Sequence, residues 1–148
     1  MLPTMKRRRY ILATVFIVIA AGVVSLPTFR DLYSISKMKE QYLVDDAVHS
    51  QLGPKEATAE EMLNPPFMKK YGLSMSEYLD EDGYFSPKGF HWKRWNIETR
   101  TAAILMWRKG DYPSAWKIRN VMGCVDGYYS RNDDSVAVMK VVDACFAQ

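Results

Sequence analysis

The sequence has few residues of the types that bind metals or act as nucleophiles. Its 148 residues include two cysteines, Cys124 and Cys145, and two histidines, His49 and His91. Two cysteines and two distant histidines match no recognised ligand spacing, so no metal site is predicted. A glycine-rich phosphate loop and a nucleophile motif are also missing from the sequence. These absences predict a protein that is not an enzyme and that holds no cofactor.

Strand-like alternation of apolar and polar residues is equally scarce. The segment 136–142 is rich in β-branched residues, which by themselves would favour a strand. Asp133 or Asp134 provides an N-cap before it, and Val138, Val142 and Cys145 recur at helical spacing. We therefore predict a last helix that ends near residue 146, in a fold that is mainly α-helical.

One long uncharged run stands near the N-terminus. Residues 10–29 carry no charge, and as a helix these 20 residues would extend about 30 Å, the thickness of a bilayer core. Four basic residues, Lys6 to Arg9, precede the run and predict a cytoplasmic N-terminus. The run is longer than the apolar part of a signal peptide, which favours a retained anchor. Weak cleavage sites near residues 22 and 25 leave a freely exported product as the alternative.

The predicted anchor divides the chain and its charge. We expect a basic cytoplasmic N-terminus at 1–9, a transmembrane signal-anchor at 10–29, a juxtamembrane helix and linker at 30–57, and a helical exported domain at 58–148. Four of the 20 basic residues precede the anchor, which leaves 16 against 17 acidic residues beyond it. The exported part is therefore slightly acidic, and nucleic acid is not an expected partner.

The expected location is a bacterial inner membrane, crossed once, with the C-terminal domain in the periplasm. A mitochondrial inner membrane facing the intermembrane space is the alternative. Both compartments allow thiols to oxidise, and two cysteines permit a single pairing, Cys124 with Cys145. In the chain-entropy model a disulfide that closes this loop contributes about 3 kcal/mol.

Two further helices are predicted in the exported domain. Phe90, Ile97 and Ile104 recur at heptad spacing, which predicts one helix over 89–109. Gly110 ends it, and a second helix is expected over 113–122.

The turn between these two helices carries a family resemblance. Gly110, Tyr112 and Ala115 resemble the turn of a tetratricopeptide-like helical hairpin, over about 20 residues and without a second copy. That resemblance implies a surface that binds proteins. A single helical hairpin within a small bundle is the simpler interpretation.

Two short segments concentrate polar or aromatic groups. The acids at 77–82 are typical of a solvated surface turn. The segment 89–96 combines aromatic with basic residues, which are common at protein interfaces. The predicted partner interface consists of Phe90, His91, Trp92, Arg94, Trp95, Trp107, Tyr112 and Trp116.

These features together predict a non-catalytic accessory or scaffold subunit of a membrane-bound assembly. It would attach to the membrane through residues 10–29 and dock other protein subunits through its exported domain. The alternative is a cleaved, freely exported binding protein of the inhibitor or immunity type. A small enzyme would instead require a pocket that converges on His91 or on the acids at 77–82.

Overall fold

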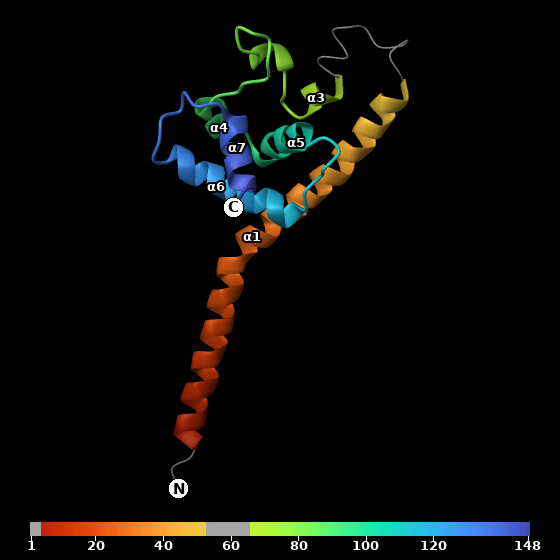
Figure 1. Ribbon diagram of the computed structural model, residues 1–148. Coiled ribbons are helices and arrows are strands. Elements are labelled where there is room, and N and C mark those ends of the chain that lie inside the picture. Colours follow the sequence, from red (N-terminus) through yellow and green to blue (C-terminus); the bar gives the residue numbers. More distant parts are fainter. Residues whose placement is uncertain (1–3, 53–65) are drawn as a thin grey trace.

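The computed structural model describes residues 4–52 and 66–148, with side chains in the first helix described mainly from Leu26 onward. Helices dominate the described part, which confirms the mainly α-helical character of the predicted fold (Figure 1). In chain order the elements are α1 (Thr4–Leu52), α3 (Pro66–Lys70), the short 3-10 helix η1 (Met75–Glu77), α4 (Gly89–Arg94), α5 (Ile97–Trp107), α6 (Ala115–Tyr129) and α7 (Val138–Phe146).

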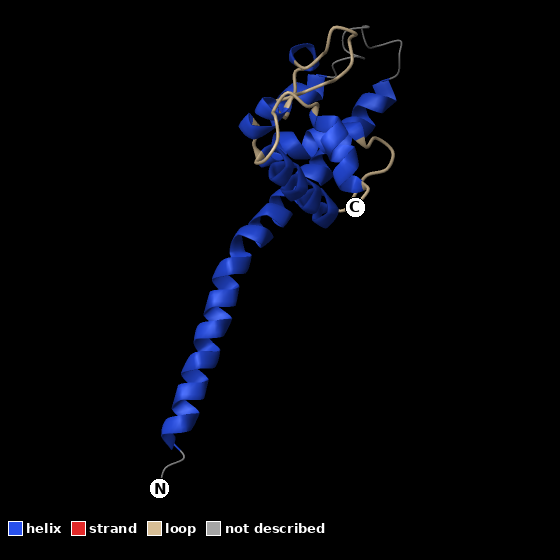
Figure 2. Cartoon of the chain, turned by 60° about the vertical axis from the view of Figure 1, so that its left-hand side comes forward, coloured by secondary structure: helices blue, strands red, loops and turns tan. Residues whose placement is uncertain are grey.

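The two halves of helix α1 have different surroundings. Its first half projects away from the other helices and its second half lies along them, as both ribbon views show (Figures 1 and 2). The helix continues through Pro27. The predicted juxtamembrane helix is therefore a direct continuation of the helix that includes residues 10–29. The segment 53–65, where the predicted linker meets the exported domain, is outside the described residues.

The predicted membrane span, 10–29, lies within the first half of α1. In the described part of the chain, no helix combines the length and the apolar character needed to cross a membrane. Nearly all side chains of the predicted span are outside that described part. The span therefore stays a prediction from the sequence.

The second half of α1 belongs to the hydrophobic core. Ile35, Met38 and Tyr42 follow one another at helical spacing and are almost completely buried. They pack where α1 meets α5 and α6. Fully burying side chains of this size contributes about 1.5–3 kcal/mol each. The core therefore includes residues of the segment 30–57, which the sequence assigns to a connection.

Beyond this apolar face, two adjacent aspartates fasten α1 to the domain. Asp45 accepts a hydrogen bond from the Tyr71 hydroxyl and pairs with Lys70 at 3.0 Å. Asp46 accepts a hydrogen bond of 3.0 Å from the Tyr112 hydroxyl and pairs with Lys109 at 3.4 Å. Each carboxylate thus binds one tyrosine and one lysine. Asp45 contacts the end of α3, and Asp46 contacts the loop after α5. We call this group of six residues the aspartate clamp.

The single helix predicted over 89–109 is wrong, because the chain forms two helices there, α4 and α5. Trp95 has an extended backbone, and the Asn96 side chain accepts the Thr99 N–H at 2.8 Å as the N-cap of α5. The heptad spacing was misleading because its first member, Phe90, is exposed whereas Ile104 is buried. Gly110 has a φ of 89°, which confirms its predicted role after the helix.

The second helix, predicted over 113–122, extends beyond its predicted C-terminal end. Helix α6 runs to Tyr129, and both Gly123 and Gly127 lie within it. Glycine costs a helix up to about 1 kcal/mol relative to alanine. Val125 and Tyr129 offset that cost because both are buried against the core.

The predicted last helix is present, but its predicted cap is wrong. Helix α7 begins at Val138, whose N–H donates to the Pro87 carbonyl at 2.7 Å, and neither Asp133 nor Asp134 caps it. The predicted stripe is confirmed because Val138, Val142 and Cys145 are buried. The predicted disulfide is also confirmed, with the sulfurs of Cys124 and Cys145 at 1.99 Å.

Replacing Tyr71 with phenylalanine tests the aspartate clamp. Because a hydrogen bond to a carboxylate is lost, Tyr71→Phe is expected to lower the free energy of unfolding by about 1–2 kcal/mol near neutral pH. Urea unfolding of the full chain in detergent, followed by tryptophan fluorescence, measures the change. Tyr84→Phe is the matched control, since Tyr84 is 70% exposed and is expected to change stability by less than about 0.5 kcal/mol.

The pH dependence of the stability lost in Tyr71→Phe identifies the hydrogen bond between Tyr71 and Asp45. Burial first, and then the bond to Asp45, raise the pKa of Tyr71 above 10.0, so the contribution is complete below pH 10 and is lost as the pH rises beyond it. Burial pushes the pKa of Asp45 upward, but the bonds from Tyr71 and Lys70 together lower it below 3.8. The contribution is therefore also lost as the pH falls below about 3.8. A penalty that stayed constant from acid to alkaline pH would contradict the clamp.

Candidate partner interface

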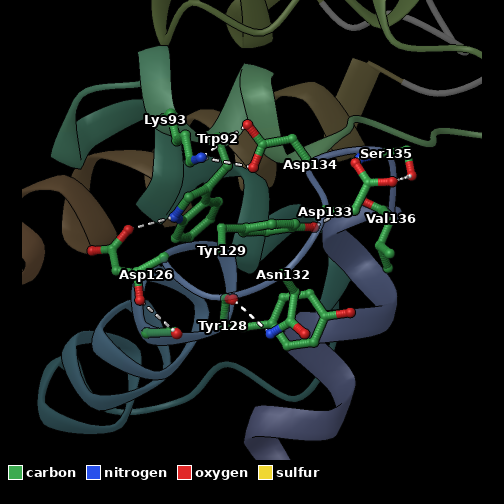
Figure 3. A network of polar contacts seen from close by, with 12 residues as sticks. Trp92, Lys93, Asp126, Tyr128, Tyr129, Asn132, Asp133, Asp134, Ser135 and Val136 are labelled. Atoms are coloured by element: carbon green, nitrogen blue, oxygen red, sulfur yellow. Dashed lines mark hydrogen bonds and ion pairs between the residues drawn. The ribbon is translucent and has the colours of Figure 1, made fainter.

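Trp92, the central residue of the predicted interface, is at the centre of a polar network and is completely buried. Its indole N–H donates to the Asp126 carboxylate of α6 at 2.8 Å (Figure 3). Arg100 joins them, with Nη1 at 3.1 Å from the same carboxylate oxygen and its guanidinium 4.8 Å from the Trp92 ring. The network ties α4, α5 and α6 together. Trp92 is therefore a core residue, and its assignment to an exposed interface is corrected.

Trp95 is likewise a core residue. Only 8% of it is exposed, and its indole N–H donates to the Tyr78 hydroxyl at 3.2 Å. The two rings meet edge to face at 5.3 Å, an arrangement that the ring quadrupoles favour. Trp95 therefore fixes the loop before α4 and has little surface to offer a partner.

Phe90, His91 and Arg94 surround these buried rings on the surface of α4. Phe90 is 44% exposed and its ring centre lies 4.0 Å from that of His91. Arg94 is also exposed. The His91 ring accepts the Lys88 backbone N–H through Nδ1 at 2.9 Å, and so caps α4. Burial, followed by the positive charge of Arg94, lowers the pKa of His91, although Glu77 acts in the opposite direction. Of these three residues, Phe90 and Arg94 offer the most surface to a partner.

The last three predicted interface residues lie on other elements. Trp107, at the end of α5, donates its indole N–H to Asp143 at 2.9 Å and is 42% exposed. Tyr112 belongs to the aspartate clamp. Trp116, in the first turn of α6, is 55% exposed. The eight predicted residues therefore do not form one patch, and Phe90, Arg94, Trp107 and Trp116 are the members that are exposed.

The acids at 77–82 form a surface turn, as predicted. The Asp80 carboxylate accepts the backbone N–H groups of Asp82 at 3.1 Å and of Tyr84 at 2.8 Å. Gly83 has a φ of 80°, a conformation that side chains disfavour. Asp80 is thus occupied in shaping the turn. Within the described residues, no group of three or more metal-binding side chains is found.

A hollow of the described surface lies between α6 and α7, in a region for which the sequence predicts no site. It is an open groove of about 750 Å³ beside the disulfide. Gly123 and Gly127 form part of its floor, and Arg131 and Lys140 contribute cationic side chains to its lining. The four-residue spacing of the glycines is visible in the sequence. Since Arg131 and Lys140 lie on different elements, their meeting depends on how α6 and α7 pack.

Substitution of two tryptophans separates core from surface among the predicted interface residues. Trp92→Phe is expected to lower the free energy of unfolding by about 2 kcal/mol, because it removes the bond to Asp126 and leaves a cavity. Trp116→Phe, the matched control, should change it by less than about 0.5 kcal/mol. Urea unfolding followed by far-UV circular dichroism gives both values. Equal losses in the two variants would contradict the burial described for Trp92.

Comparison with known proteins adds no family to this description. No protein-family model, no curated protein and no solved structure matches the chain.

Proposed function

We propose that the chain is a non-catalytic, single-span accessory or scaffold subunit of a membrane-bound assembly. The observation that carries the proposal is the continuity of α1 from Thr4 to Leu52. The same helix includes the uncharged run 10–29 and contributes Ile35, Met38 and Tyr42 to the core. A span in this position would be joined to the domain without a flexible link. Such a connection suits a subunit that holds a binding surface at a fixed position above a membrane.

Contacts at the end of the predicted span support this arrangement. Arg119 of α6 donates to the Thr28 hydroxyl at 3.0 Å and lies 3.8 Å from the Asp31 carboxylate. Trp116 precedes Arg119 by nearly one turn, and Phe29 follows Thr28; both rings are more than half exposed. Aromatic and basic side chains are enriched at the surfaces of membranes. With 10–29 in a bilayer, this edge of the domain would lie beside the headgroups.

The non-catalytic part of the proposal is supported by what the candidate catalytic groups already do. His91 uses Nδ1 to accept a backbone N–H, and Asp80 accepts two. Both side chains therefore have local structural tasks. The groove between α6 and α7 contains neither of them.

The location that we propose is a bacterial inner membrane, with the N-terminus in the cytoplasm and the domain in the periplasm. A mitochondrial inner membrane with the domain in the intermembrane space would suit the same arrangement. In both cases the Cys124–Cys145 disulfide would form in an oxidising compartment.

A released inhibitor is the competing function, and one observation favours it. Among the described side chains of α1, the buried ones begin at Ile35, so cleavage near residue 22 or 25 would leave all of these in the domain. The two functions predict different N-termini for the mature chain. They also differ in whether the chain is found in a complex with other subunits.

The intact mass of the mature chain, taken from membranes solubilised in mild detergent, distinguishes the two functions. We expect the full-length chain, about 2 Da lighter than its reduced form because of the disulfide, in a stoichiometric complex with other subunits. Native mass spectrometry of the same sample reports both quantities. A chain that begins near residue 23 or 26 and is found alone in the soluble fraction would exclude the membrane subunit and favour the inhibitor.

A further inference from the structure

The side chains that line the groove between α6 and α7 carry a net positive charge. Arg131 and Lys140 contribute to its lining, and no aspartate or glutamate side chain does. Within the described residues, neither cation takes part in an ion pair. Arg131 donates only its Nε–H, to the Gly127 carbonyl at 3.1 Å. The other guanidinium N–H groups and the Lys140 ammonium are therefore available to an acceptor.

The acidic residues near the groove have partners elsewhere. Asp126 binds Trp92 and Arg100, and Asp134 pairs with Lys93 at 2.7 Å, so both face α4 (Figure 3). The remaining two acids of this region are Asp133, which binds Ser135, and Asp143, which binds Trp107. All four carboxylates are thus used outside the groove. Its two exposed cations are therefore free to pair with acidic groups of another molecule.

The floor of the groove permits a close approach by a backbone. A methyl group added at Gly123 would meet no atom within 4 Å, and one added at Gly127 would meet only the Arg131 guanidinium, at 3.6 Å. Val136, Val141 and Ala144 contribute apolar side chains to the lining, and Tyr128, Asn132 and Gln148 contribute polar ones. A volume of about 750 Å³ is far larger than a single small anion fills. An extended segment that alternates acidic and apolar side chains would match both the charge and the shape.

We infer that this groove docks an acidic peptide segment of a partner subunit, with carboxylates of the segment at Arg131 and Lys140. The inference rests on the proposed function, since it names the docking surface of that subunit. Apolar side chains of the segment would cover Val136 and Ala144, and its backbone would pass over Gly123 and Gly127. Charge-assisted bonds to two cations would set the direction of the segment in the groove.

Peptide binding to the full chain in detergent tests the groove. The probes are two short fluorescein-labelled peptides, one alternating glutamate with leucine and one alternating glutamine with leucine, and fluorescence anisotropy reports their affinity. The glutamate peptide should bind, and R131Q/K140Q should weaken it about tenfold, as expected for the loss of two partly exposed ion pairs. The control K37Q/K69Q removes two exposed lysines elsewhere and should change the affinity less than about twofold.

A second variant tests the groove without changing charge. Gly123→Leu fits the fold, because its side chain enters open space, but it would occupy the floor of the groove and should abolish binding. Equal affinity of the two peptides, or equal weakening in R131Q/K140Q and K37Q/K69Q, would overturn the inference. Inorganic phosphate that displaces the glutamate peptide at low millimolar concentration would also overturn it, because the site would then be one for a small anion.

The same variants distinguish failure of the groove from failure of the proposed function. If partner subunits copurify with the wild-type chain and are lost from R131Q/K140Q alone, the groove is the docking surface. If they copurify equally with R131Q/K140Q, the groove assignment fails while the subunit function stands. If no partner copurifies with the wild-type chain, the proposed function itself fails, together with the inference that rests on it.

Discussion

The burial of one face of α1 is the interaction on which the rest of the structure depends. Ile35, Met38 and Tyr42 place the helix against α5 and α6, and the aspartate clamp fixes it to the end of α3 and to the loop after α5. Burial and the nearby Asp46 carboxylate both raise the pKa of Tyr42, so its ring stays neutral in the core. Without this face, the short helices that follow would bury too little apolar surface to form a stable core. The N-terminal segment of the chain is therefore a structural element of the domain as well as its predicted anchor.

A second group of contacts determines which surfaces are left for function. The Trp92–Asp126–Arg100 network and the pairing of Lys93 with Asp134 use the acidic residues of α6 and of the following loop. The disulfide then holds α7 beside α6. Because Asp126 and Asp134 bind residues of α4 and no aspartate or glutamate lines the groove, Arg131 and Lys140 have no ion-pair partner within the described residues. The positive charge of the groove is thus a consequence of how the core is assembled.

The sequence predicted those features that depend on local periodicity and on simple counting. The helical stripe of α7 and the pairing of two cysteines are examples. It misplaced features that depend on contacts between distant segments. The break between α4 and α5 was hidden by a heptad repeat whose first member is exposed, and the start of α7 is capped by the Pro87 carbonyl rather than by an aspartate.

The candidate interface was predicted only in part, again because contacts between distant segments decide which side chains are exposed. Aromatic and basic composition indicated the region around α4, but composition does not reveal that Trp92 and Trp95 point inward. The groove was missed because Arg131 and Lys140 lie on either side of a loop, and only the packing of α7 on α6 brings both to one surface.

Hydrogen exchange along α1 tests the central claim most directly, that the second half of this helix is part of the folded domain. Backbone amides of residues 35–46 in the full chain should exchange as slowly as those of α5, because both would open only when the domain unfolds. Rapid exchange at 35–46, with α5 and α6 still protected, would show that α1 is a separate connection. Such a result would contradict a rigid helical connection between the predicted anchor and the core.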